Sequence, residues 1–166
     1  MIEVTSGMAT VPVHILVEGL RRFACPAATA WRHVLNYTSW QTYSISVPVA
    51  GAPGTEGEIV LLRKEEEGVT FPPYFARTIH LDPGKRVIWK TYPRDPEPGN
   101  DYFGFVDFAV AAEGEATRFS YRFLYELIVP AAPEAELARY KSDLIAATES
   151  VNETIFTKLQ RLVEAG

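Results

Sequence analysis

Aromatic side chains alternate with mostly polar ones along residues 117–127, which read TRFSYRFLYEL. Phe119, Tyr121, Phe123 and Tyr125 all share one parity. Because successive side chains of a strand point to opposite faces, this pattern predicts a strand with one aromatic face and one solvated face. So many rings on one face need a large apolar partner, and any fold of this chain has to supply one.

The end of the sequence offers that partner. From Pro133 onward the apolar residues recur in steps of three and four, which predicts one amphipathic helix of roughly 30 residues. Pro133 at its start and acidic residues in its first turn agree with the helix dipole. We expect Val151, Ile155 and Leu159 on the face that meets the aromatic strand.

Between the two termini, turn residues divide the chain into short elements. A strand is predicted over 11–25 with Gly19 as a bulge or bend, followed by a helix that Pro26 opens and a second helical turn at 37–43. Further antiparallel strands are predicted, giving a sheet of about six to seven strands; they lie at 44–49, 58–65, 71–81, 86–92, 102–111 and 117–127.

One helix cannot cover a flat sheet of that width, so the sheet must curl around it. The fold class is therefore α+β, with residues 1–166 forming a single domain.

Composition excludes several classes of function. The net charge of −5 and a pI of about 5.3 argue against a nucleic-acid partner. A single cysteine, Cys25, excludes an intrachain disulfide. The sequence has no apolar run long enough for a membrane span and no basic leader of a signal peptide, so we expect a cytoplasmic protein.

The order and spacing of several segments resemble the helix-grip proteins of the START-like (SRPBCC) superfamily, which includes polyketide cyclase/dehydrase-like proteins and lipid-transfer modules. The resemblance covers roughly residues 11–164, and it is carried by FACPAATAWRHVLN (23–36), YTSWQTY (37–43), GTEGEIVLLR (54–63), HLDPGKRVIW (80–89) and EATRFSYRF (115–123). It implies a cavity between the concave sheet face and the long helix. The Pro-rich loop 93–101 lies near the implied entrance, and whether it gates the cavity stays open.

Strand parity combined with the implied cavity predicts a set of wall residues. Arg77 joins the set if its strand has the matching register. The set comprises Trp40, Arg77, Trp89, Phe108, Phe119, Tyr121, Phe123, Tyr125, Val151 and Ile155. The hydroxyls of Tyr121 and Tyr125 need partners when they are buried, and a pocket with a ligand supplies them.

Sequence motifs for metal or cofactor chemistry are missing. His14, His33 and His80 have no ligand spacing to acidic or cysteine residues, and the chain has no nucleophile elbow, P-loop or dinucleotide fingerprint. We therefore expect no metal and no cofactor.

Three functions remain, of which the first is binding of a small hydrophobic or aromatic ligand without covalent chemistry. The second is a cyclase or dehydratase, a lyase in which Tyr121, Tyr125 and Arg21 polarise a carbonyl and stabilise an enolate. The third is a protein-binding regulator that uses the outer sheet face, although Ser120, Arg122 and Glu126 on that face argue against it. The oligomeric state stays open, with a homodimer as one alternative.

Overall fold

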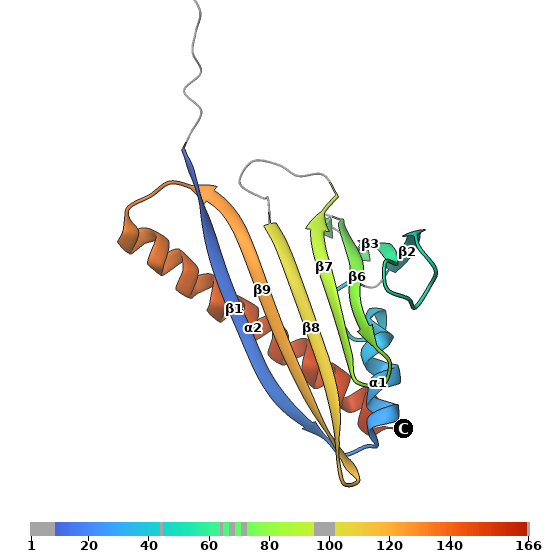
Figure 1. Cartoon of the computed structure of the whole chain (residues 1–166). Helices are drawn as coiled ribbons and strands as arrows, with labels where there is room; N and C mark the ends of the chain where they lie inside the picture. The colour runs from blue at the N-terminus through green and yellow to red at the C-terminus, as the bar shows by residue number, and fades with distance from the viewer. Residues whose placement is uncertain are drawn as a thin grey trace, which may run out of the picture.

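Seven strands form one antiparallel sheet in the order β1-β9-β8-β7-β6-β3-β2 (Figure 1). The computed structural model describes residues 9–43, 45–63, 65–66, 69–70, 73–94 and 102–165. The strands of the sheet are β1 (Thr10–Phe23), β2 (Ile45–Ala50), β3 (Ile59–Arg63), β6 (Tyr74–Asp82), β7 (Arg86–Pro93), β8 (Tyr102–Glu113) and β9 (Ala116–Pro130). The two-residue strands β4 (Glu65–Glu66) and β5 (Val69–Thr70) pair separately.

The helices lie on one side of this curved sheet. Helix α2 (Glu134–Glu164) crosses the sheet diagonally, and helix α1 (Ala27–Leu35) lies near the C-terminal end of α2 (Figure 1). The short turn predicted at 37–43 is a 3-10 helix, η1 (Tyr37–Ser39). The predicted α+β helix-grip fold is confirmed. In the described part of the chain, no helix is long and apolar enough to cross a membrane.

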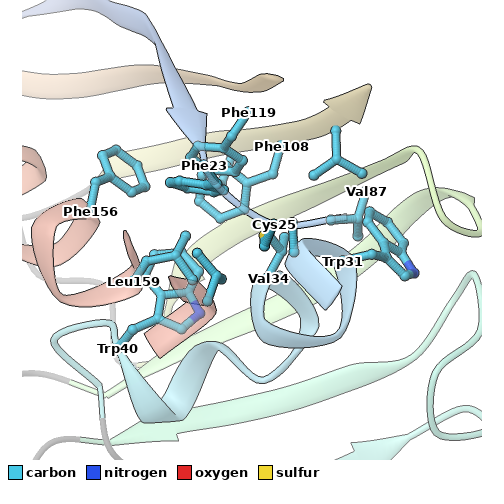
Figure 2. Packing of buried hydrophobic residues seen from close by; sticks show 14 of the residues in the cluster. Phe23, Cys25, Trp31, Val34, Trp40, Val87, Phe108, Phe119, Phe156 and Leu159 are labelled. Carbon is cyan, nitrogen blue, oxygen red and sulfur yellow. The ribbon is translucent and has the colours of Figure 1, made fainter. Parts of the chain in front are cut away.

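Rings fill the space between α2 and the strands β8 and β9. Phe23, Phe108, Phe119 and Phe156 are completely buried, and Figure 2 shows them meeting Trp40 and Leu159 from the helical side. Phe108 sits in the middle, with its ring centroid 5.5 Å from that of Phe119 and 6.0 Å from that of Phe156. The aromatic face of β9 therefore packs against α2, the apolar partner that the sequence pattern predicts.

Of the three α2 residues that were predicted to face the aromatic strand, Leu159 is buried and Ile155 is partly buried, but Val151 is not. The buried residues of α2 are Asn152, Phe156, Leu159 and Val163, all in the second half of the helix. Val151 is 51% exposed, so its prediction as a wall residue is wrong. The three- and four-residue steps that include Phe156 fix the helix phase, and this phase turns polar Asn152 inward and Val151 outward.

Arg77 was also placed on the wrong face. Its side chain is exposed on the outer face of β6, between the buried residues Ala76 and Thr78. The β6–β7 register shifts between Thr78 and His80, which reverses the alternation along β6. Counting back from the inward-facing Leu81 therefore gives Arg77 the wrong parity.

Two glycines make room for the two tyrosines of β9. Gly19 of β1 lies directly opposite Tyr121, and Gly104 of β8 lies directly opposite Tyr125. A Cβ on Gly19 would lie 2.6 Å from Cζ of Tyr121, and one on Gly104 would lie 2.7 Å from Cδ1 of Tyr125. The β1–β9 register is continuous through Gly19, so of the two predicted alternatives, a bulge or a bend, the bulge is wrong. Gly19 instead admits a ring that lies over its backbone.

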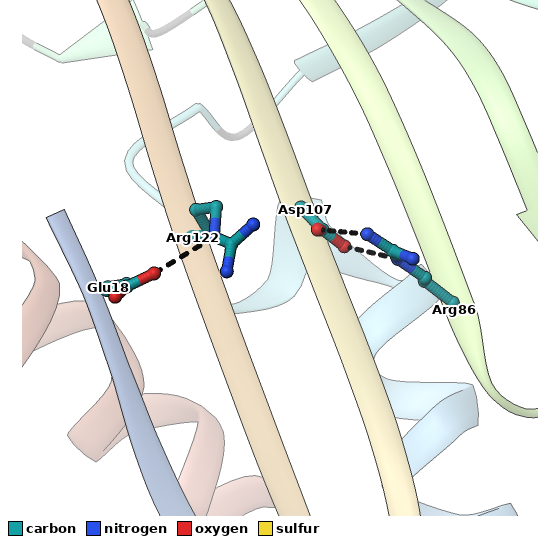
Figure 3. A network of polar contacts seen from close by, with 4 residues as sticks. All are labelled: Glu18, Arg86, Asp107 and Arg122. Atoms are coloured by element: carbon teal, nitrogen blue, oxygen red, sulfur yellow. Dashed lines mark hydrogen bonds and ion pairs between the residues drawn. The ribbon is translucent and has the colours of Figure 1, made fainter. Parts of the chain in front are cut away.

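Charged side chains in alternating sign line the outer face (Figure 3). Arg122 donates to Glu18 at 3.0 Å across β9 and β1, and Arg86 binds Asp107 through two hydrogen bonds of 2.9 and 2.7 Å. These exposed pairs contribute little to stability, roughly 0–1 kcal/mol each, but they keep this face polar around its apolar residues.

We predict that Gly19→Ala destabilises the protein by about 1–3 kcal/mol, because the added methyl group overpacks against Tyr121. Urea unfolding measures the loss. In a Tyr121→Ala background the same substitution has room, so its cost should nearly vanish. An equal cost in both backgrounds would show that the tyrosine ring is not the reason for the glycine.

Candidate functional site

Three of the predicted wall rings belong to the closed core. Trp40, Phe108 and Phe119 are at most 1% exposed. The indole nitrogen of Trp40 donates to the carbonyl oxygen of His33 at 2.8 Å, which ties η1 to helix α1. Phe123 is 5% exposed and Ile155 packs against the same cluster from α2. These side chains hold α2 on the sheet.

Arg21 and Tyr121 meet around the ring of Phe156. The centroids of Tyr121 and Phe156 lie 4.3 Å apart, and Cζ of Arg21 lies 5.9 Å from the centroid of the same ring. Arg21 Nη2 donates to Glu153 of α2, so its charge is paired. The structure thus brings two of the three weak catalytic candidates together, with Arg21 fastening α2 to the edge strand β1.

Tyr125 lies apart from that group, over Gly104. Burial raises the pKa of Tyr125, and the phenol of Tyr74 raises it further. Its hydroxyl is therefore protonated at neutral pH and can donate a hydrogen bond. The tyrosines of β9 diverge, with Tyr121 leaning over β1 and Tyr125 over β8.

A pocket of about 310 Å³ opens elsewhere, between η1 and the concave face of β3, β6 and β7. We call it the η1 pocket. Its apolar walls are Leu35, Val60, Leu81, Val87 and Trp89, and its polar side chains are Tyr37, Thr38, Ser46, Glu58 and Thr78. Among the predicted wall residues, Trp89 alone lines it.

Tyr37 is the central polar group of the η1 pocket. Its hydroxyl lies 3.0 Å from Oγ of Ser46. Burial raises the pKa of Tyr37 and the nearby Glu58 carboxylate raises it further, while the Ser46 hydrogen bond partly offsets them. Sequence reasoning missed Tyr37 because it sits in a single 3-10 turn, where no strand parity or helical period assigns a direction.

Three buried polar atoms have no protein hydrogen-bond partner within the described ranges. They are Nε of Arg21, Oγ1 of Thr91 and Nδ2 of Asn152. Arg21 and Thr91 share the inward parity of their strands, and Asn152 lies on the buried face of α2. Buried polar groups in native proteins almost always find a partner, so the interior has hydrogen-bonding capacity for a ligand or water.

The described residues contain no group of histidine, cysteine and acidic side chains that could hold a metal ion. His14 pairs with Glu126 at 2.6 Å, and His80 lies 3.3 Å from Glu56. Burial raises the pKa of the Cys25 thiol, which favours its unreactive protonated form.

The outer sheet face carries an apolar row between its charged pairs. Leu16, Leu124 and Phe105 are direct neighbours across β1, β9 and β8, and they are 48%, 41% and 38% exposed. Exposed apolar patches favour contact with other molecules. The polar residues of this face argued against a protein-binding regulator, whereas this apolar row favours one.

Comparison with known proteins agrees with the architecture. A family model described as "Polyketide cyclase / dehydrase and lipid transport" matches residues 14–164. Comparison with curated proteins found no match. Residues 95–101 of the predicted gating loop lie outside the described residues, so the gating role of that loop stays a prediction.

Solved structures share the fold at low sequence identity. A Staphylococcus aureus protein of unknown function has a TM-score of 0.72 and 13% identity, covering 93% of this chain and 96% of its own. The Zhui aromatase/cyclase of a Streptomyces species has a TM-score of 0.63 and 15% identity, covering 92% and 94%. Ara h 8.0201 has a TM-score of 0.62 and 11% identity, covering 93% and 100%. At these identities the likeness shows the fold alone.

The raised pKa of Tyr37 predicts a pH dependence of stability. An unfolded tyrosine has a pKa of about 10. The stabilisation from the protonated, buried phenol is therefore fully present below about pH 10 and is lost as the pH rises through the folded pKa. The free energy of unfolding of Tyr37→Phe should fall less steeply above about pH 10 than that of the wild type.

Urea unfolding at several pH values measures this difference in slope. Tyr140→Phe, at an exposed position of α2, controls for the loss of a phenol from the surface. Parallel curves for the wild type and Tyr37→Phe would contradict a buried, protonated Tyr37.

Proposed function

The chain belongs to the polyketide cyclase / dehydrase and lipid transport family, and from this premise we propose that it binds a small hydrophobic or aromatic molecule in the η1 pocket. The observation that carries the proposal is the pocket itself. Its volume of about 310 Å³ lies at the small end of the range for ligand sites, and its walls combine apolar side chains with a few polar groups.

The lining narrows the chemistry of the ligand. Trp89 presents an aromatic surface that suits a flat ring, while Val60, Val87 and Leu81 supply apolar contact. Tyr37 offers a hydroxyl for one carbonyl or hydroxyl group. The carboxylate of Glu58 lines the same pocket and repels an anion, so the proposed ligand is neutral.

The other predicted wall residues lie beside the η1 pocket. Tyr121, Phe123, Tyr125 and Ile155 lie on the concave side of the sheet or on the helix packed against it, in the core cluster. In our proposal they close the interior on the side of α2, so the ligand does not extend from the η1 pocket toward α2.

Filling the pocket should abolish binding without unfolding the protein. With β-naphthol at a hundred times its Kd, the wild type should gain ~2.7 kcal/mol of stability, measured as a shift in thermal unfolding. Val60→Phe places a ring in the η1 pocket and should remove this shift.

Val47→Phe is the matched control, because Val47 lies exposed on the neighbouring strand β2. It adds the same bulk outside the pocket and should leave the shift intact. An unchanged shift in Val60→Phe would place β-naphthol elsewhere and contradict the proposal.

A second candidate function is a cyclase or dehydratase in the same pocket. The family and the fold shared with an aromatase/cyclase favour it. Dehydration needs a base that removes a proton beside a carbonyl and an acid that protonates the leaving hydroxyl as water. The protonated phenol of Tyr37 can serve as the acid, and the Glu58 carboxylate, which accepts from Gly54 N at 2.7 Å, can serve as the base.

The two sets of catalytic candidates make opposite predictions. If the η1 pocket is the active site, Tyr37→Phe should lower kcat about 10²- to 10⁴-fold on a synthetic β-hydroxyketone, which carries the hydroxyl that leaves as water, and Tyr121→Phe should have little effect. If Tyr121 and Arg21 carry the reaction, Tyr121→Phe and Arg21→Ala show the loss instead. Absence of turnover by the wild type, with β-naphthol binding intact, would leave the binding function and reject the enzyme for this substrate.

A further inference from the structure

A second, smaller void shares two walls with the η1 pocket. It has a volume of about 30 Å³, and Tyr37 and Trp89 line it together with Gln41, Leu62, Thr91 and Val106. We call it the annex. A cavity needs roughly 10–15 Å³ to hold one water molecule, so the annex has room for about two groups of that size.

Thr91 gives the annex an unmet hydrogen-bonding demand. It lies two residues after Trp89 on the concave side of β7, and its Oγ1 is buried without a protein partner within the described ranges. Leu62 and Val106 make the surroundings apolar. A buried hydroxyl in such surroundings gains most from a ligand atom that bonds to it.

The two walls that the annex shares with the η1 pocket are aromatic rings in contact. Tyr37 and Trp89 meet edge-on, with centroids 5.4 Å apart and ring planes at 68°. Trp89 is held from the core by Phe108, at 5.6 Å between centroids. Tyr37 belongs to a one-turn helix, and its hydroxyl is held by Ser46. Tyr37 is only partly buried, whereas Trp89 is 8% exposed and belongs to the core, so Tyr37 is the ring with more room to move.

We propose that Tyr37 and Trp89 form a gate between the η1 pocket and the annex, and that the site selects ligands with an aromatic body and a short arm ending in a carbonyl or hydroxyl. The body occupies the η1 pocket, the arm passes between the two rings, and its terminal oxygen bonds to the Thr91 hydroxyl. This inference rests on the proposed binding function, since it requires a ligand in the η1 pocket.

The size and chemistry of the annex decide what the arm is. About 30 Å³ admits a slim chain end and excludes a second ring. A threonine hydroxyl both donates and accepts, so it suits either a carbonyl or a hydroxyl. Sites that hydrogen-bond a ligand group reject analogues without that group far more strongly than apolar sites reject a missing methylene. The annex would therefore contribute selectivity, while the larger pocket contributes apolar contact.

The test compares two naphthalenes whose arms have equal length. One carries a butanone side chain and the other a plain butyl chain, and calorimetry measures the Kd of each. The wild type should bind the butanone at least about tenfold more tightly than the butyl compound. Thr91→Val keeps the shape of the side chain, removes the hydroxyl, and should abolish this preference. Because the hydroxyl it removes has no hydrogen-bond partner among the described residues, the variant should fold normally.

Thr78→Val is the matched control. Thr78 lies on the neighbouring strand β6 and lines the η1 pocket, not the annex. It should change the affinity for both compounds alike and keep the butanone preference. Equal affinities of the wild type for the two compounds, with β-naphthol still bound, would overturn the gate alone. Failure of all three naphthalenes to bind would overturn the ligand-binding function together with it.

Discussion

The packing of Phe156 against the rings of the sheet is the contact on which the rest of the structure depends. Its centroid lies 5.3 Å from Phe119, 4.3 Å from Tyr121 and 5.8 Å from Trp40. Aromatic pairs add about 0.5–1.5 kcal/mol each beyond the area that they bury. Through Phe156 the long helix is fixed on β9, and through Trp40 the same cluster fixes η1. The position of Tyr37, three residues before Trp40, follows from that anchorage.

The strands and turns could be predicted because their signals are local. The hairpin at DPGK needs a glycine with positive φ, and Gly84 has a φ of 79°. Side-chain parity placed the rings of β9 correctly on the concave face. Parity failed for Arg77, where a register shift reverses it, and helix phase failed for Val151. For Arg77 the pairing of β6 with β7 decides the orientation, and no local pattern records it. For Val151 the correct phase follows once Phe156 is counted in the helical repeat.

The candidate site was harder to predict than the fold, for the same reason. Trp89 was expected in a cavity between the sheet and α2, and it lines the η1 pocket instead; its inward direction could be predicted because it sits in a regular strand. Tyr37 and Glu58 lie in a 3-10 turn and just before a strand, where alternation carries no information. The glycines opposite Tyr121 and Tyr125 could be assigned only with the β1–β9 and β8–β9 registers in hand.

Side-chain volume across the sheet explains why the η1 pocket opens away from the middle of α2. On β8 and β9 the concave face carries phenylalanines and tyrosines, and glycine opposite each tyrosine lets its ring lie flat over the neighbouring strand. These rings fill the space under α2. On β3 and β6 the same face carries the smaller side chains Val60, Ala76 and Thr78, and η1 meets this part of the sheet through the single ring of Tyr37. Because η1 is anchored through Trp40, it cannot move closer to the sheet, and space remains where the side chains opposite it are small. The η1 pocket therefore has two causes. The aromatic packing on β8 and β9 fixes the position of η1, and the side chains of β3 and β6 opposite η1 are small.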